Sequence, residues 1–270
     1  MPLEEKKKHI NEADTPLVSI ITPLYNAVSF ISETIKSIRK QSYQHWEHLI
    51  VDDASTDSSL RIAESFASSD SRIRIIKNME NLGAAVCRNK ATELAKGDFI
   101  AFLDADDLWH SDKLAKQVAF MQANDIAVSY SNYTQIDAEG NSLNRRIKAL
   151  PKLSYVKQLR NNYIGNLTGM YHAARIGKIV APELRKRQDW GVWLEAIKRS
   201  EKPALGLQED LAMYRVHHAS MSANKSSLVK YNFNFYRKHL GYSWLRSVLL
   251  LGLFFWEYFI VRPKYIQKIK

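Results

Sequence analysis

The sequence holds one cysteine, Cys87, among 270 residues. A single thiol excludes an internal disulfide framework and a cysteine-rich zinc module, and it is typical of a reducing compartment. The first ten residues lack the apolar core of a secretory signal, and no later stretch offers the ~20 apolar residues that a membrane-spanning helix needs. We therefore expect a cytoplasmic protein that neither leaves the cell nor crosses the membrane.

The charge is unbalanced, with 39 Lys and Arg against 28 Asp and Glu, which gives a formal net charge of +11. This balance suits an anionic partner such as nucleic acid, anionic lipid or a phosphate-bearing substrate. Because 46% of the residues are hydrophobic, the chain can bury a substantial core, and global disorder is excluded. A basic module that binds nucleic acid or anionic lipid without catalysis stays open as one class of function.

Short β-rich runs alternate with helical patterns in the first 110 residues, which predicts a parallel sheet covered by helices. Pro23 is expected to end the first strand. Polar motifs follow three of these strands, and in open α/β sheets ligands bind outside the carboxyl ends, so the motifs should share one crevice. The expected strands are 17–22, 47–51, 72–76 and 99–103, and the expected helices are 30–42, 60–66 and 84–96.

The second half is less regular, with an expected strand at 126–132, a turn at 137–141, a helix at 190–199 and a strand at 212–216. In the tail, residues 244–270, Glu257 separates two apolar runs. Each run is too short to span a bilayer, but an aromatic and basic segment of this kind can lie in the membrane interface. The alternative is an amphipathic helix packed on its own domain or on a second subunit.

Asp104, Asp106 and Asp107 follow an apolar strand. Burying several carboxylates there is costly without a cation, and a hard divalent ion bridging to phosphate oxygens would relieve the repulsion. The alternative is a solvated acidic turn or helix cap. Carboxylates at strand ends also argue against nucleic-acid binding, since they repel phosphate unless a metal is present.

Two further groups suit recognition of a nucleotide. Asp52 and Asp53 end another strand, where a carboxylate can accept the imide N–H of uracil, although helix capping would also explain them. Arg88 lies in a helical segment and can reach a phosphate or a base carbonyl, with a salt bridge to one of the aspartates as the alternative.

Asp189 precedes Trp190, and a carboxylate beside apolar rings suits a general base. Its alternative role is to cap the following helix. Farther along, Arg215 and His217 belong to a segment rich in cations, imidazoles and hydroxyls, which suits phosphate or metal binding.

Taken together, these segments resemble glycosyltransferase family 2, whose members are inverting enzymes with the GT-A fold. The resemblance covers about residues 17–222. It rests on Val18 to Asn26, Ile50 to Asp57, Asn81-Leu82-Gly83 with Arg88-Asn89, Phe102 to Asp107, Gln188-Asp189-Trp190 and Tyr214 to His217.

The resemblance implies an α/β protein with a Rossmann-like, mostly parallel sheet flanked by helices, a smaller acceptor-binding region and a C-terminal helical tail. The expected GT-A domain covers 16–222, with a nucleotide-binding half at 16–110 and an acceptor-binding half at 111–222. An N-terminal extension, 1–15, precedes the domain, and an aromatic and basic tail, 223–270, follows it.

The resemblance also implies a role for each candidate residue. The nucleoside site is matched by Pro23, Tyr25, Asp52 or Asp53, and Arg88. The motif for the donor diphosphate and a Mn²⁺ or Mg²⁺ ion is matched by Asp104 and Asp106. His217 is expected to close over the donor phosphates or to assist the metal, and Arg215 can do the same by its charge. The family's general base usually lies in an acidic pair, here Gln188-Asp189, which leaves Asp189 as the only matching carboxylate.

The expected activity is transfer of a sugar from a nucleotide-sugar donor, a UDP-sugar, to a hydroxyl of a surface polysaccharide or a lipid-linked oligosaccharide. The resemblance is to bacterial enzymes of capsule, O-antigen or teichuronic-acid synthesis, and it favours contact of the tail with the inner membrane leaflet and no nucleic-acid partner. The alternatives within the fold are an inactive nucleotide-sugar-binding partner and a polyprenyl-phosphate sugar transferase, whose relatives use long membrane spans.

Overall fold

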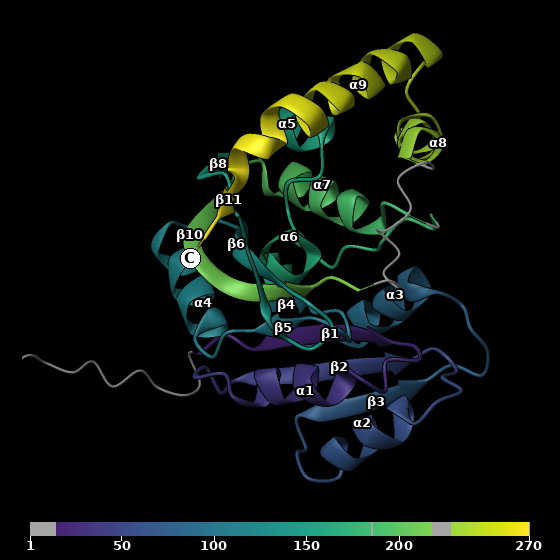
Figure 1. Ribbon diagram of the computed structural model, residues 1–270, viewed down its shortest axis with the longest axis vertical. Helices are drawn as coiled ribbons and strands as arrows, with labels where there is room; N and C mark the ends of the chain where they lie inside the picture. The colour runs from purple at the N-terminus through teal and green to yellow at the C-terminus, as the bar shows by residue number, and fades with distance from the viewer. Residues whose placement is uncertain (1–14, 185, 218–227, 270) are drawn as a thin grey trace, which may run out of the picture.

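The computed structural model describes residues 15–184, 186–217 and 228–269, and in them one mixed sheet of eleven strands runs through the protein (Figure 1). Its N-terminal part has the parallel order β3-β2-β1-β4, with α1 and α2 beside it. The α/β fold class is confirmed. The elements of this part are β1 (Val18–Leu24), α1 (Ile31–Arg39), β2 (Trp46–Asp52), α2 (Ser59–Ala67), β3 (Ile73–Lys77), α3 (Ala84–Leu94) and β4 (Phe99–Phe102).

Pro23 lies inside β1 rather than ending it, so that expectation is wrong. The carbonyl of Ile21 accepts from Leu103, on the β4 side, whereas the carbonyl of Leu24 accepts from Asp53, on the β2 side. By this alternation the nitrogen of Pro23 faces the side on which β4 has already ended, and no ladder hydrogen bond is lost there.

The C-terminal half continues the same sheet. The strand β9 pairs antiparallel with both β4 and β6, and β10 runs parallel to β6. The strand expected at 212–216 is the end of this longer β10, and the turn at 137–141 joins β6 to β7. The elements are β5 (Leu108–Trp109), α4 (Lys113–Ala123), β6 (Val128–Ile136), β7 (Ser142–Ile147), β8 (Lys152–Leu153), α5 (Tyr155–Arg160), η2 (Asn166–Thr168), β9 (Met170–His172), α6 (Ala173–Ile176), α7 (Gln188–Ser200) and β10 (Ala204–Arg215).

The tail packs on its own domain. Residues Trp244–Tyr265 form a 22-residue helix with a mean hydropathy of 1.6, which is long and apolar enough to cross a membrane by length and composition. The expectation that the tail is too short to span is therefore wrong. The tail elements are α8 (Leu228–Asn234), η3 (Phe235–His239), α9 (Trp244–Trp256), η4 (Glu257–Val261), η5 (Arg262–Tyr265) and β11 (Ile266–Lys268).

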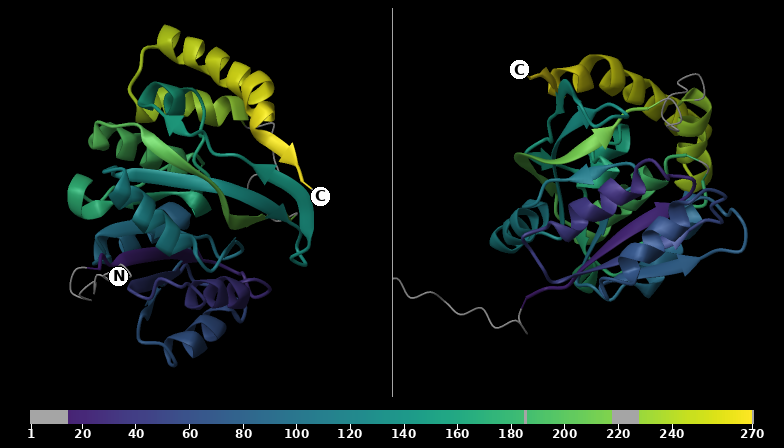
Figure 2. Two further views of the ribbon diagram at one scale, coloured as in Figure 1. Left: turned by 90° about the vertical axis from the view of Figure 1, so that its left-hand side faces the viewer. Right: turned by 60° about the horizontal axis from the view of Figure 1, so that its bottom comes forward.

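Glu257 separates two apolar runs in the sequence, but the helix continues through it. Its side chain is buried against the domain, where Lys157 donates to both carboxylate oxygens at 2.7 Å and Tyr163 also donates. The last strand, β11, pairs antiparallel with β7, so the C-terminal end of the tail helix is tied to the sheet of the domain (Figure 2).

A hydrophobic cluster separate from the two that cover the sheet joins α7 to the tail. Its centre is Trp190, which stacks on Phe235 with ring centroids 4.5 Å apart and contacts Phe254 at 5.8 Å. Aromatic pairs at such separations add to the free energy gained by burial. The tail thereby fixes the start of α7, where the candidate base lies.

Candidate active site

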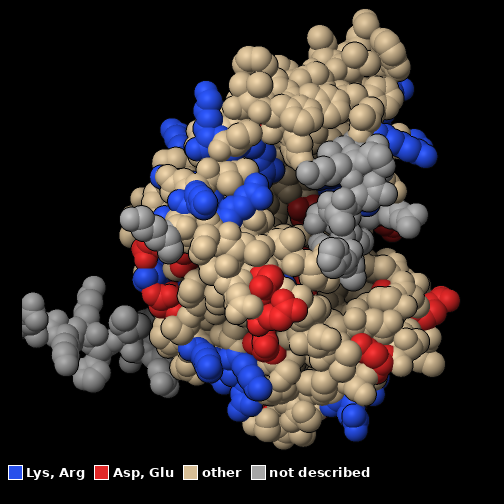
Figure 3. Space-filling view, viewed as in Figure 1, with Lys and Arg blue, Asp and Glu red and all other residues tan. Residues whose placement is uncertain are grey.

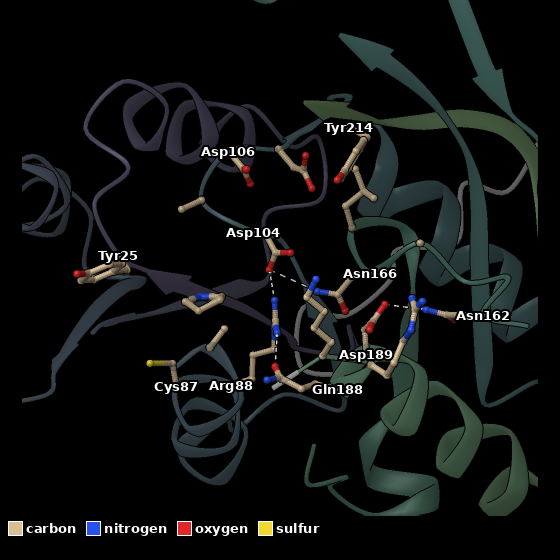
Figure 4. Close-up of a pocket in the computed structure, with 18 of the residues that line it drawn as sticks. Tyr25, Cys87, Arg88, Asp104, Asp106, Asn162, Asn166, Gln188, Asp189 and Tyr214 are labelled. Carbon is tan, nitrogen blue, oxygen red and sulfur yellow. Dashed lines mark hydrogen bonds and ion pairs between the residues drawn. The ribbon is translucent and has the colours of Figure 1, made fainter. Parts of the chain in front are cut away.

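A cavity of about 1110 Å³ opens at the carboxyl ends of β1 and β4 (Figure 4). Tyr25 lies toward one end of it, Asp189 and Asn162 lie toward the other, and Arg88 and Asp104 lie between them. The motifs expected to share a crevice therefore do so. The residues that the sequence placed there and that line this cavity are Pro23, Tyr25, Asp53, Arg88, Asp104, Asp106, Asp189 and His217.

Asp53 organises the loop that leads into α3. Its carboxylate accepts from the backbone N–H groups of Leu82 and Gly83, at 2.9 and 2.8 Å, and from the side chain of Asn78. Burial acts to raise the pKa of Asp53, but these hydrogen bonds outweigh it and the pKa is lowered. Gly83 has φ of +88°, a conformation that favours glycine, so the carboxylate and the glycine together shape this wall.

Asp52, the other aspartate of the pair, is 2% exposed and does not line the cavity. Its Oδ2 accepts from the backbone N–H of Ser55 at 3.3 Å, which is a turn contact. Of the two candidates left open by the sequence, the structure brings Asp53 and not Asp52 to the cavity.

Arg88 connects the two halves of the site. From α3, its Nη2 donates to Asp104 at 2.6 Å and its Nη1 donates to the side-chain oxygen of Gln188 at 3.1 Å (Figure 4). The salt bridge weighed from the sequence is present, and the buried guanidinium joins the end of β4 to the start of α7.

The acidic segment after β4 is not a solvated turn. Asp107 is buried and accepts from the backbone N–H of Arg215 at 2.9 Å, and Asp106 lies 2.8 Å from Nε2 of His217. Burial first, and then the charge of the neighbouring aspartates, raises the pKa of both Asp106 and Asp107. Negative charge is therefore crowded at this strand end.

Arg215 does not reach the cavity, in contrast to the role implied by the resemblance. It is 1% exposed, and its guanidinium donates to the carbonyls of Asp106 and Ala138 and to the carboxylate of Glu33. Its hydrogen bonds with Asp106 and Asp107 hold the acidic segment in place without lining the cavity. The part of this cation- and hydroxyl-rich segment that follows His217 lies outside the described residues.

The acidic segment fits a divalent cation. Oxygen ligands suit Mg²⁺ and Mn²⁺, an imidazole nitrogen is acceptable to Mn²⁺, and a cation would relieve the crowding that raises the carboxylate pKa values. Within the ranges that the structure describes, no three His, Cys, Asp or Glu side chains form a ready-made metal cluster. Donor phosphate oxygens would therefore have to complete the coordination shell.

Asp189 lies inside the first turn of α7 and faces the cavity. The residue at the helix cap is Arg187, and no side chain caps the helix, so the capping role considered for Asp189 is wrong. Asn162 donates to Oδ2 of Asp189 at 2.7 Å. This amide holds the carboxylate in place at the cavity wall, as a proton acceptor requires.

The far end of the cavity was not foreseen from the sequence. It is lined by Lys186, Arg187, Phe254, Tyr258 and Arg262 beside Asp189. Three of these residues belong to the tail helix. The only sequence signal was the position of Arg262 beside the apolar run, and the pairing of that run with α7 is a tertiary contact that no local pattern encodes.

This fold and site define a class of protein. A model of the family "Glycosyl transferase family 2" matches residues 19–179. The chain belongs to glycosyltransferase family 2 and is a glycosyltransferase.

Among its relatives is TuaG of Bacillus subtilis (strain 168), named for teichuronic acid biosynthesis, with 43% identity over 83% of this chain and 88% of TuaG. Another is WfgD of Escherichia coli, a UDP-Glc:alpha-D-GlcNAc-diphosphoundecaprenol beta-1,3-glucosyltransferase. It is 39% identical over 80% of this chain and 84% of its own length.

Two solved structures share the fold. TarS of S. aureus (residues 1–349), in complex with UDP-GlcNAc, has a TM-score of 0.71 and 20% identity over 92% of this chain and 74% of that one. The mannosyltransferase PcManGT of Pyrobaculum calidifontis, in complex with GDP-Man and Mn²⁺, has a TM-score of 0.63 and 18% identity over 93% of this chain and 72% of that one. The GT-A-like fold is thereby confirmed.

Proposed function

We propose that the protein transfers a sugar, with inversion, from a UDP-sugar to a hydroxyl of a lipid-linked glycan used in surface polysaccharide synthesis. The observation that carries the proposal is one cavity that holds the nucleotide-side residues at one end and Asp189 at the other, joined through Arg88. The relative WfgD is named for a UDP-Glc donor and a diphosphoundecaprenol-linked acceptor, which supports the choice of both substrates.

In the proposed reaction, Asp189 accepts the proton of the acceptor hydroxyl, whose oxygen attacks the anomeric carbon as the bond to the donor phosphate breaks. Asn162 holds the base in place, and Arg88 fixes Asp104 against the donor side. Asp104, Asp106 and His217 would hold a Mn²⁺ or Mg²⁺ ion, which supplies charge neutralisation for the leaving diphosphate.

The base is tested by Asp189→Asn, which keeps the side-chain shape and removes the proton acceptor. Transfer should fall ~10²- to 10⁴-fold while donor binding is unchanged. Glu195→Gln is the matched control, because Glu195 lies on the outer face of the same helix in a surface pair with Arg199. Full turnover by the Asp189→Asn variant would exclude Asp189 as the base.

The donor is tested by thermal unfolding with UDP-, GDP-, dTDP- and CMP-sugars, each with Mn²⁺ and with EDTA, because a ligand that binds the folded state raises its stability. We expect one UDP-sugar to stabilise the protein in a metal-dependent way. Equal stabilisation by all four classes, or none by UDP-sugars, would refute the donor assignment.

We further propose that the tail helix lies in the cytoplasmic membrane interface without crossing it. Its outer face exposes Leu245, Leu249, Trp256 and Phe259, each at least 60% exposed, and that face appears as an uncharged ridge with Lys and Arg gathered below it (Figure 3). Glu257 and β11 tie the helix to the domain, which argues against a span. An apolar face flanked by basic residues suits an anionic leaflet.

Liposome flotation tests this placement. Leu249→Glu and Trp256→Glu should each reduce binding to vesicles that contain phosphatidylglycerol, whereas Val180→Glu, at a site 69% exposed elsewhere, should not. If all three variants bound vesicles as the unmodified protein does, the proposal that the tail helix lies in the membrane interface would be refuted.

A further inference from the structure

Positive charge gathers at the end of the cavity that is farthest from the nucleotide side. Lys186 and Arg187 reach it from the segment before α7, and Arg262 reaches it from η5 of the tail. Lys186 and Arg262 are 76 positions apart in the sequence, and both line the cavity with Asp189 because the tail packs against α7.

Arg187 is held in a fixed position. Its backbone has φ of +74°, a left-handed conformation that is rare for residues other than glycine and persists only where the surroundings impose it. Its Nε donates to the side-chain oxygen of Asn232 at 2.7 Å, and its guanidinium lies 6.0 Å from the ring of Trp190 and 5.8 Å from that of Phe254.

Arg262 is positioned by neutral groups. Its Nη1 donates to the side-chain oxygen of Asn161 at 3.1 Å and to the carbonyl of Asn162 at 2.8 Å. Asn162 is also the residue that donates to Asp189, so one asparagine sets the positions of both the arginine and the base.

The charge of this pair is not balanced within the described residues. The buried arginines Arg88 and Arg215 have acidic partners, Asp104 and Glu33, whereas neither of the half-buried Arg187 and Arg262 forms an ion pair in the described ranges. Burial lowers the pKa of Arg187 and the charge of Arg262 lowers it further, while the charge of Asp189 acts in the opposite direction. Two fixed guanidinium groups of this kind match an anion with several oxygens.

We propose that Arg187 and Arg262 bind the diphosphate that links the acceptor sugar to its lipid. The inference rests on the proposed function and assigns the acceptor subsite within it. Phe254 and Tyr258 line the same end of the cavity, and the outer face of their helix is apolar. A lipid held here by its diphosphate leaves the cavity along the tail helix, with its sugar directed to Asp189.

Binding of farnesyl diphosphate, farnesyl monophosphate and farnesol in EDTA tests the subsite without knowledge of the acceptor sugar and without a metal. The unmodified protein should bind the diphosphate most tightly. Arg187→Gln and Arg262→Gln should each weaken diphosphate binding on the order of tenfold to a hundredfold and leave farnesol binding unchanged, as expected for a lost charge-assisted hydrogen bond. Arg61→Gln, the same charge change on the distant, exposed helix α2, should have no effect.

Lysine variants and UDP binding complete the test. Arg187→Lys and Arg262→Lys keep the charge and should retain part of the affinity, and UDP binding with Mn²⁺ should be unchanged in every folded variant. Diphosphate binding that is insensitive to both glutamine changes, or a loss confined to UDP, overturns the assignment. Failure of the unmodified protein to bind any UDP-sugar would instead count against the proposed function.

Discussion

The contact between Glu257 and Lys157 offers a direct test of how the tail supports the site. The carboxylate is buried, and Lys157 and Tyr163 both donate to it. Removing one partner of a buried ion pair costs ~3–5 kcal/mol. Because Lys157 keeps 27% of its side chain exposed and can be rehydrated, we take a lower cost, about 2–3 kcal/mol, for Glu257→Gln.

For a domain of this size, each kcal/mol lowers the melting temperature by about 2–4 °C, so Glu257→Gln should lower it by about 4–12 °C in a thermal unfolding experiment. The surface pair of Glu195 and Arg199 gives the control, because Glu195→Gln should change stability by at most ~1 kcal/mol. Adding Lys157→Met to Glu257→Gln should recover part of the loss, since no partly buried cation is then left without its partner. A shift of less than about 1 °C for Glu257→Gln would refute the reasoning.

Three further outcomes follow from single contacts. Arg88→Met removes the link between β4 and α7, so transfer should fall while the fold, followed by circular dichroism, persists. Gly169→Ala should destabilise the protein by roughly 1–3 kcal/mol in denaturant unfolding, because the added Cβ would lie 2.2 Å from the ring of Trp193. Hydrogen bonds from Arg72 lower the pKa of Asp70. The contribution of Asp70 to stability is therefore fully present above its unfolded pKa of ~3.9 and is lost as the pH falls through its folded pKa. Asp70→Asn should reduce the loss of stability in acid, measured by denaturant unfolding at a series of pH values.

Local patterns predicted the elements of the first 110 residues well, because each strand, helix and strand-end motif there is encoded in a short run of residues. Each β-rich run became a strand within a few residues, and carboxyl-end motifs converge by the geometry of any parallel sheet. The position of Asp53, Asp104 and Asp106 at the cavity could therefore be predicted without tertiary information. Pro23 was misjudged because the neighbour it lacks, β4, is a property of the sheet and not of the segment.

The end of the cavity beside Asp189 was harder to predict because it is built from distant segments. Arg187 and Arg262 line the same cavity because the tail packs against α7. The burial of Glu257 could not be predicted locally, because in the sequence it is a charged residue between two apolar runs. Arg215 was misplaced for a similar reason. Its segment looks like a phosphate loop, yet its donors are taken up by backbone carbonyls and Glu33.

Gln188 shows why a single carboxylate remains where the family usually has an acidic pair. Its side-chain oxygen accepts from Arg88, and its side-chain nitrogen donates to the carbonyl of Leu184. An ionised glutamate could make the first contact but not the second, because it has no proton to donate. It would also compete with Asp104 for the ion pair with Arg88. The amide therefore satisfies both Arg88 and the Leu184 carbonyl, and it leaves Asp189 as the one carboxylate of this pair of residues, at a position that lines the cavity.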